Sequence, residues 1–294
     1  MDVLYPKTLN EFIGQPQVTS QLTKIIAQAS IPGQIFPHIL LTSSPGMGKT
    51  ALARVIANEM DYKMEELDLS QMTSKRLARI LLQTERPLIF LDEIQRAKKE
   101  QQEMVLQWLS EGKLIMPDGF AENISYLSAI AATTREEKLD DALLDRFLIV
   151  EMQDYRSEDL KRILEAMADK LQVVIPEADI VRLADAALGS PRTGGKLVSA
   201  YQTLLHSEEV SVENVLKFLG REPDGLTPRH IRYMQALWEN DGQLGQAPLS
   251  RITRMHQNIL FEVEGALLKK KFITLTAQGR LLTSKGRERV KRGV

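Results

Sequence analysis

The sequence contains no cysteine among its 294 residues. This absence excludes disulfides, thiolate metal sites and a cysteine nucleophile. The four histidines lie apart, without the spacing of metal ligands. No apolar run approaches the ~18 residues of a membrane span, and the opening MDVLYPKTLNEF lacks the apolar core of a signal peptide. We therefore expect a cytoplasmic protein with no membrane partner.

The chain also has almost no net charge, at −1, so its total charge identifies no partner. The distribution of charge is more informative, because residues 222–294 contain 13 Lys/Arg and 7 Asp/Glu. Within that region, residues 269–294 hold nine Lys/Arg and one acid. A basic C-terminal end on an acidic body favours a module that binds a polyanion, although a solvated charged tail would have the same composition.

The order of apolar segments predicts the fold class. Buried strands are predicted at 38–43, 87–93, 125–134 and the end of 140–152, alternating with helices at 15–29, 50–60 and 98–111. This alternation is typical of an α/β domain with a parallel sheet. Helices then follow at 156–170, 177–188, 191–206, 211–219, 228–239, 248–255 and 258–270, before a hairpin around Gln278 and Gly279. We expect an α/β domain at 1–153, a helical subdomain at 154–221 and a winged helix at 222–294.

Residues 43–50, SSPGMGKT, match the phosphate-loop pattern G-x-x-x-x-G-K-[ST] except at Ser43. The stretch lies between a predicted strand and a predicted helix, which would direct backbone N–H groups toward one phosphate. Lys49 would reach the β- and γ-phosphates and Thr50 would hold Mg²⁺. If the first position of the loop requires a positive φ, Ser43 costs about 1 kcal/mol or more. We therefore expect an ATP site whose hydrolysis rate is uncertain.

The second apolar strand, LIFLDE, ends in two carboxylates. Ligands of open parallel sheets bind at the carboxyl ends of the strands. Asp92 would lie near Mg²⁺, and Glu93 would orient and polarise the attacking water. Thr134, at the end of the third strand, and two arginines, Arg146 and Arg192, add a hydroxyl and positive charge for a transferring phosphoryl group.

Taken together, these segments resemble the AAA+ ATPases, and within them the RuvB family of Holliday-junction branch-migration motors. The resemblance covers nearly the whole chain. The segments that carry it are LYPKTLNEFIGQPQV (4–18), SSPGMGKT, LIFLDEIQR (88–96), AATTR (131–135), LLDRF (143–147), GSPR (189–192) and the wing-like EGALLKKKFITLTAQGRLLT (264–283).

The resemblance implies a role for each matching residue. Thr134 would be the first sensor, Arg146 a finger reaching the nucleotide of a neighbouring subunit, and Arg192 the second sensor. The implied nucleotide contacts are Tyr5, Pro6, Ile13, Pro45, Gly46, Met47, Gly48, Lys49, Thr50, Ala51 and Arg192. It also implies a homo-oligomer, a hexameric ring around DNA, whose phosphates would meet Arg280, Lys285 and Arg287.

Several positions depart from the family pattern. Ser43 and Ser44 replace the usual Gly-Pro, Leu144 stands where a first arginine precedes the finger, and Tyr5 replaces an arginine. The interval between Glu93 and Thr134 is short, although KLIMPDGF (113–120) still predicts a trimmed hairpin. Because this hairpin docks RuvA in the family, a RuvA-like partner through 113–126 is an open expectation.

Three functions are compatible with this sequence. The first is an ATP-driven motor on duplex or branched DNA, as in RuvB-like branch migration. The second is a clamp- or helicase-loader. The third is a nucleotide-gated DNA adaptor with weak ATPase activity. This function is slightly favoured by Ser43 in place of the first loop glycine and by Leu144 in place of the arginine that precedes the finger. The retention of Glu93, Thr134, Arg146 and Arg192 favours the motor.

Overall fold

The computed structural model describes residues 4–115, 121–205 and 210–292. Its contacts divide the chain into two compact units. One unit comprises Tyr5–Ser43 and Met47–Asp154, and the other comprises residues 1–4, Ser44–Gly46 and Tyr155–Val294. Each unit is described by itself.

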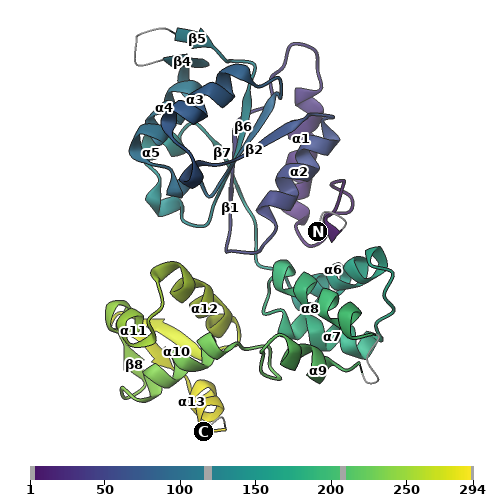
Figure 1. Cartoon of the computed structure of the whole chain (residues 1–294), viewed down its shortest axis with the longest axis vertical. Coiled ribbons are helices and arrows are strands. Elements are labelled where there is room, and N and C mark those ends of the chain that lie inside the picture. The colour runs from purple at the N-terminus through teal and green to yellow at the C-terminus, as the bar shows by residue number, and fades with distance from the viewer. Residues whose placement is uncertain (1–3, 116–120, 206–209, 293–294) are drawn as a thin grey trace. The chain divides into compact units, whose positions relative to one another are not determined.

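The first unit contains a five-stranded parallel sheet in the order β2-β3-β6-β1-β7. The strands are β1 (Ile39–Thr42), β2 (Met64–Asp68), β3 (Leu88–Asp92), β6 (Ser128–Thr133) and β7 (Leu148–Glu151). The helices are α1 (Pro16–Ala29), α2 (Lys49–Glu59), α3 (Ser74–Gln83), α4 (Lys99–Glu111) and α5 (Asp141–Leu144). Figure 1 shows α1 and α2 on one face of the sheet and α3, α4 and α5 on the other. The predicted α/β class is confirmed.

The two central strands β1 and β6 are apolar runs whose residues are all buried. Burial on both faces is what a covered parallel sheet requires of its central strands. Thr42 lies opposite Thr133 in this register, and Asp68 lies opposite Asp92 in the β2–β3 pair. The polar ends of the strands are therefore brought to one edge of the sheet.

Two elements of this unit were not predicted. β2 reads MEELD and lies at the edge of the sheet, with only Leu67 buried. Because it carries three acids, it has none of the apolar character of the inner strands. α3 has a clear amphipathic pattern, with Leu77, Ala78 and Leu81 buried, so its sequence signal was present.

The predicted hairpin after α4 is confirmed in its strands. β4 (Lys113–Ile115) pairs antiparallel with β5 (Ala121–Asn123). Gly112 ends α4 with φ +64°, where a side chain would collide with Ser125. The predicted Pro-Asp-Gly turn at 117–119 lies outside the described residues.

The second unit begins with four helices, as predicted: α6 (Ser157–Lys170), α7 (Glu177–Ala186), α8 (Pro191–Leu204) and α9 (Val212–Phe218). Gly194 and Gly195, early in α8, have low helix propensity, but both are buried. A Cβ at Gly194 would lie 2.5 Å from the side chain of Leu164, which is fully buried in α6. The glycine therefore allows α8 to pack closely on α6.

The same unit ends in the predicted winged helix. Its elements are α10 (Pro228–Trp238), β8 (Gln243–Leu244), α11 (Gln246–Thr253), α12 (Gln257–Lys269), β9 (Ile273–Thr276), β10 (Gly279–Leu282) and α13 (Ser284–Lys291). β9 and β10 form the predicted hairpin, and β8 joins it through β10. β8 and α13 were not predicted, since β8 has two residues and α13 is largely charged. Among the described residues, no helix combines the length and the apolar character needed to cross a bilayer.

Candidate functional site

The phosphate loop joins β1 to α2 in the way its sequence predicts. Gly46 has φ +80° and Gly48 has φ +100°, a region that side chains disfavour, so both glycines are required by the backbone. Gly48 is the N-cap of α2 and Lys49 is the first helical residue. Thr50 and Ala51 follow in the first turn of α2. The free N–H groups of such a helix start favour a phosphate.

Ser43 does not strain the loop. It is not one of the described non-glycine residues with positive φ, so the expected backbone penalty does not arise. Its side chain has a contact of its own: the Lys49 ammonium donates to the Ser43 carbonyl oxygen at 3.0 Å and to the Ser43 hydroxyl at 3.1 Å. Lys49 is only 7% exposed, so these contacts hold a buried cation in the loop.

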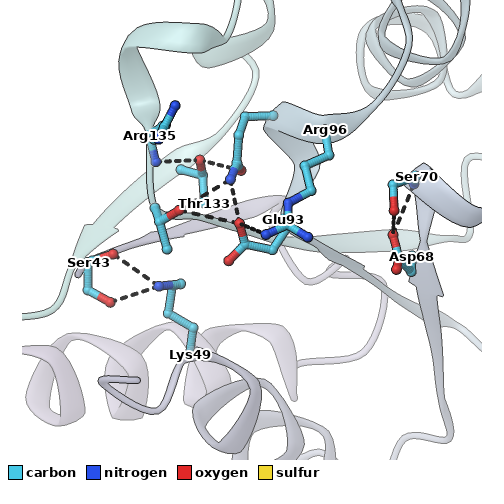
Figure 2. Close-up of polar contacts among 10 residues, drawn as sticks. Ser43, Lys49, Asp68, Ser70, Glu93, Arg96, Thr133 and Arg135 are labelled. Atoms are coloured by element: carbon cyan, nitrogen blue, oxygen red, sulfur yellow. Dashed lines mark hydrogen bonds and ion pairs between the residues drawn. The ribbon is translucent and has the colours of Figure 1, made fainter. Parts of the chain in front are cut away.

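Asp92 ends β3 and Glu93 follows it, in the same unit as Lys49 and Thr134. Glu93 adopts φ +50° and ψ +49°, a left-handed conformation that is uncommon for a non-glycine residue. Its carboxylate accepts a hydrogen bond from the Thr134 hydroxyl at 3.3 Å, and it lies 3.7 Å from the Arg96 guanidinium. In Figure 2, Ser43, Lys49, Glu93 and Thr133 form one group, apart from Asp68 and Ser70.

A further side chain, Gln95, was missed by the sequence reasoning. It lies in the 3-10 turn Ile94–Arg96 and hydrogen bonds to Glu93, Thr133 and Thr134. No sequence motif points to Gln95, because its partners Thr133 and Thr134 lie 38 and 39 residues further along the chain.

The predicted magnesium ligands, Thr50 and Asp92, are a hydroxyl and one carboxylate. Within the part of the chain that the structure describes, no three His, Asp or Glu side chains form a metal cluster. This donor set fits Mg²⁺, which keeps several waters and takes one or two protein ligands together with substrate phosphates. Asp68, opposite Asp92, is occupied in capping a 3-10 turn, where it accepts from the backbone N–H and the hydroxyl of Ser70.

The N-terminal segment that carries Tyr5, Pro6 and Ile13 is fixed against the rest of the first unit. The Leu9 N–H donates to Glu59 at 2.7 Å, and the Arg54 guanidinium lies 5.5 Å from the centre of the Tyr5 ring. Gln15, which is 2% exposed, exchanges two hydrogen bonds with the backbone of Gln153. Sequence reasoning did not identify Gln15 as the clamp that holds this segment to the chain after β7.

The two predicted arginines occupy different units. Arg146 is exposed after α5, and its Nε donates to the Ser110 hydroxyl at 2.8 Å. Arg192 is exposed in the first turn of α8, in the second unit. Pro45 and Gly46 of the phosphate loop belong by their contacts to the same unit as Arg192. Within the first unit, the structure joins Glu93 to Thr134 and Lys49 to Ser43 by hydrogen bonds. Arg192 belongs to the second unit and is described apart from them.

The three cations predicted to contact DNA differ in their surroundings. Arg280 forms a bidentate pair with Glu264, at 2.7 and 3.1 Å, and their side chains are 15% and 5% exposed. The Glu264 hydrogen bonds and charge raise the pKa of Arg280, and Tyr233 donates to the same carboxylate at 2.8 Å. Burial, more than Glu264, raises the pKa of Tyr233. This arrangement gives Arg280 a structural role in the wing that the sequence did not indicate.

Lys285 and Arg287 of α13 have looser contacts. The Lys285 ammonium donates to the Lys270 carbonyl at 3.0 Å and lies 5.1 Å from the centre of the Phe272 ring. Arg287 donates to the Asp241 carbonyl at 3.2 Å. Neither cation is paired with a carboxylate in these contacts.

Comparison with known proteins decides the family. Residues 4–153 match the model of the Holliday junction DNA helicase RuvB P-loop domain. The chain belongs to the RuvB family. Residues 223–291 also match the RuvB C-terminal winged helix domain. The recognition made from the sequence is confirmed.

Several relatives match along the whole chain. The Holliday junction branch migration complex subunit RuvB of Thermotoga maritima is 29% identical over 307 residues, which cover 98% of this chain and 92% of the relative. The subunit of Fervidobacterium nodosum is 30% identical over 302 residues, with 96% and 87% covered. A solved structure of the T. maritima RuvB Holliday junction branch migration motor has a TM-score of 0.87 at 28% identity and covers 98% of both chains.

Proposed function

We propose that the chain is an ATP-driven DNA motor that performs RuvB-like branch migration of four-way junctions. One observation carries this proposal: a single chain matches both the RuvB P-loop domain and the RuvB winged helix. The chain also aligns with 92% of the length of a relative named for branch migration. The retained phosphate loop, Asp92, Glu93 and Thr134 support ATP hydrolysis as the source of work. The loader and the adaptor are not favoured.

The proposed chemistry is hydrolysis of the γ-phosphate of ATP. The Mg²⁺ held by Thr50 and Asp92 would neutralise developing charge on the phosphates. Lys49 and the N–H groups of Gly46 to Ala51 would bind the phosphates, and Glu93 would orient and polarise the attacking water. Thr134 and Arg192 would contact the γ-phosphate, and Tyr5, Pro6 and Ile13 would lie beside the adenine.

We also propose a homo-oligomer, in the form of a hexameric ring. The proposal is supported by Arg146, which is exposed and could reach the nucleotide of a neighbouring subunit. Sedimentation with Mg-ATP and DNA tests the ring, and Arg146→Ala should leave the assembly intact while removing turnover. An unaltered turnover would contradict a role for Arg146 in a neighbour's site.

For contacts with DNA we propose Lys285 and Arg287 of α13, with Arg280 of β10 supporting the winged helix that presents them. The β4–β5 hairpin remains the proposed docking site for a RuvA-like partner through 113–126. A cytoplasmic location likewise stays a prediction.

Steady-state ATP turnover with and without four-way-junction DNA tests the main proposal. We expect the junction to stimulate the wild-type protein and Glu93→Gln to abolish turnover while ATP still binds. Glu137→Gln is the matched control, because Glu137 is an exposed carboxylate outside the site. Turnover that stays at the Glu93→Gln level with DNA present would overturn the motor and favour a loader or an adaptor.

A further inference from the structure

The Gln95 side chain is fixed at both ends of its amide. The amide oxygen accepts a hydrogen bond from the Thr133 hydroxyl at 2.7 Å. Thr133 is fully buried, and its hydroxyl oxygen in turn accepts from the Arg135 N–H at 3.0 Å. Figure 2 shows Thr133 and Arg135 joined in this way. Because the oxygen of Gln95 faces Thr133, its NH₂ group must face the opposite way.

That NH₂ group is directed to two residues of the predicted catalytic set. It donates to the Glu93 carboxylate at 2.5 Å and to the Thr134 hydroxyl at 3.2 Å. An inverted amide would place its oxygen against the carboxylate, where two acceptors repel each other. The observed orientation is therefore the one that the surrounding groups require.

The Thr134 hydroxyl has one hydrogen, and in this structure it is directed to Glu93 at 3.3 Å. If Thr134 donates to the γ-phosphate instead, Glu93 loses that bond. The remaining neighbouring donors are then Gln95 and the half-exposed Arg96, whose guanidinium is 3.7 Å away. Gln95 is the better placed, since it also contacts the oxygen of Thr134.

We propose that Gln95 is a positioning residue that couples Thr134 to Glu93. It keeps the carboxylate oriented toward the attacking water when Thr134 turns to the γ-phosphate. The Glu93 carboxylate thereby keeps its orientation while Thr134 contacts phosphate. This inference rests on the proposed ATP hydrolysis at the same site.

The test is a kcat and KM comparison in the full chain with Mg-ATP. Gln95→Met keeps the length of the side chain and removes its hydrogen bonds. Gln95→Glu keeps an acceptor for the Thr133 hydroxyl but cannot donate to Glu93 and adds a like charge. We expect both to lower kcat at least about tenfold, since a hydrogen bond to a charged group is lost, with KM and ATP binding within about twofold.

Gln102→Met is the matched control, because the Gln102 amide donates only to the Ala97 carbonyl in this region, at 3.1 Å, and it should leave kcat unchanged. Thr134→Val and the double variant Gln95→Met/Thr134→Val complete a cycle. We expect kcat of the double variant to lie no more than about threefold below that of the less active single variant, because each change breaks the same connection.

A purely structural role would lower the melting temperature and ATP binding along with kcat, and its losses would multiply with those of Thr134→Val. Either that result or a Gln95→Met kcat within twofold of wild type would overturn the inference while leaving the proposed function standing. A wild-type protein without turnover would overturn the proposed function, and this inference with it.

Discussion

Removal of Arg280 should destabilise the winged helix by an amount set by the carboxylate that it leaves behind. Glu264 is 3% exposed, and Arg280 supplies two of its hydrogen bonds. Breaking a buried ion pair by removing one partner costs about 3–5 kcal/mol, because a buried charge is left uncompensated. Arg280→Met should therefore lower the free energy of unfolding by about 3 kcal/mol, allowing for the partial exposure of Arg280.

Denaturant unfolding of the full chain measures this loss, with fluorescence of Trp238 in α10 as a reporter of the winged helix. Glu264→Gln is the compensating change, since it removes the charge and keeps an acceptor for the Tyr233 hydroxyl. The double variant Arg280→Met/Glu264→Gln should recover at least about 1 kcal/mol relative to Arg280→Met. A cost below about 1 kcal/mol for Arg280→Met would refute the reasoning, because exposed ion pairs contribute no more than that.

The same variants decide between support of the wing and contact with DNA. A cation that meets a phosphate adds about 1 to the dependence of log affinity on log salt. We expect Arg280→Met/Glu264→Gln to keep the salt slope of the wild type, because Glu264 already occupies the Arg280 guanidinium there. A slope reduced by about 1 would restore Arg280 as a phosphate contact.

Three further predictions concern other polar side chains. Ser43→Gly should change ATP turnover less than about tenfold, since the Lys49 ammonium loses one of two hydrogen bonds to Ser43 and keeps the carbonyl acceptor; a larger change in a turnover assay would make the hydroxyl essential. Gln15→Ala should lower the free energy of unfolding by about 1–3 kcal/mol and weaken ATP binding, because it frees the adenine segment; unchanged melting and binding would refute this. Burial, aided by Arg221, lowers the pKa of His230 to about 4 from 6.5. Because only the unfolded chain then binds the proton between these values, stability should fall by about 2 kcal/mol between pH 6.5 and 5. His230→Gln should reduce that fall in denaturant titrations, and an unaltered pH dependence would contradict it.

The sequence predicted those parts of the site that are contiguous in the chain. SSPGMGKT is one stretch, so its spacing defines the loop before any folding is considered, and LIFLDE places Asp92 and Glu93 at a strand end in the same way. Gln95 could not be found by this route, because its role depends on β3 and β6 lying side by side. Gln15 is a similar case, since it bridges to Gln153 across 138 residues.

Charge patterns do not show which cations are paired in the fold. Arg280 stands beside the wing turn in a basic segment, so the sequence favoured a phosphate contact. The structure pairs it with Glu264, which lies 16 residues earlier in α12. The sequence did not predict β2, because this edge strand has three acids and lacks the apolar run by which inner strands are recognised.

The contacts of Ser43 indicate which residues should limit the rate of ATP hydrolysis. Its backbone is unstrained, and its hydroxyl and carbonyl both hold Lys49, so the departure from glycine preserves the cation of the loop. Phosphate binding is then supported at Ser43, Lys49 and the two glycines. Activation of water by Glu93 should be more sensitive to local geometry than phosphate binding is. The left-handed backbone and the shared hydrogen bonds of Glu93 admit few alternative positions of its carboxylate. The hydrolysis rate should accordingly depend more on Gln95 and Thr134 than on Ser43, and kcat of Gln95→Met should fall further than that of Ser43→Gly.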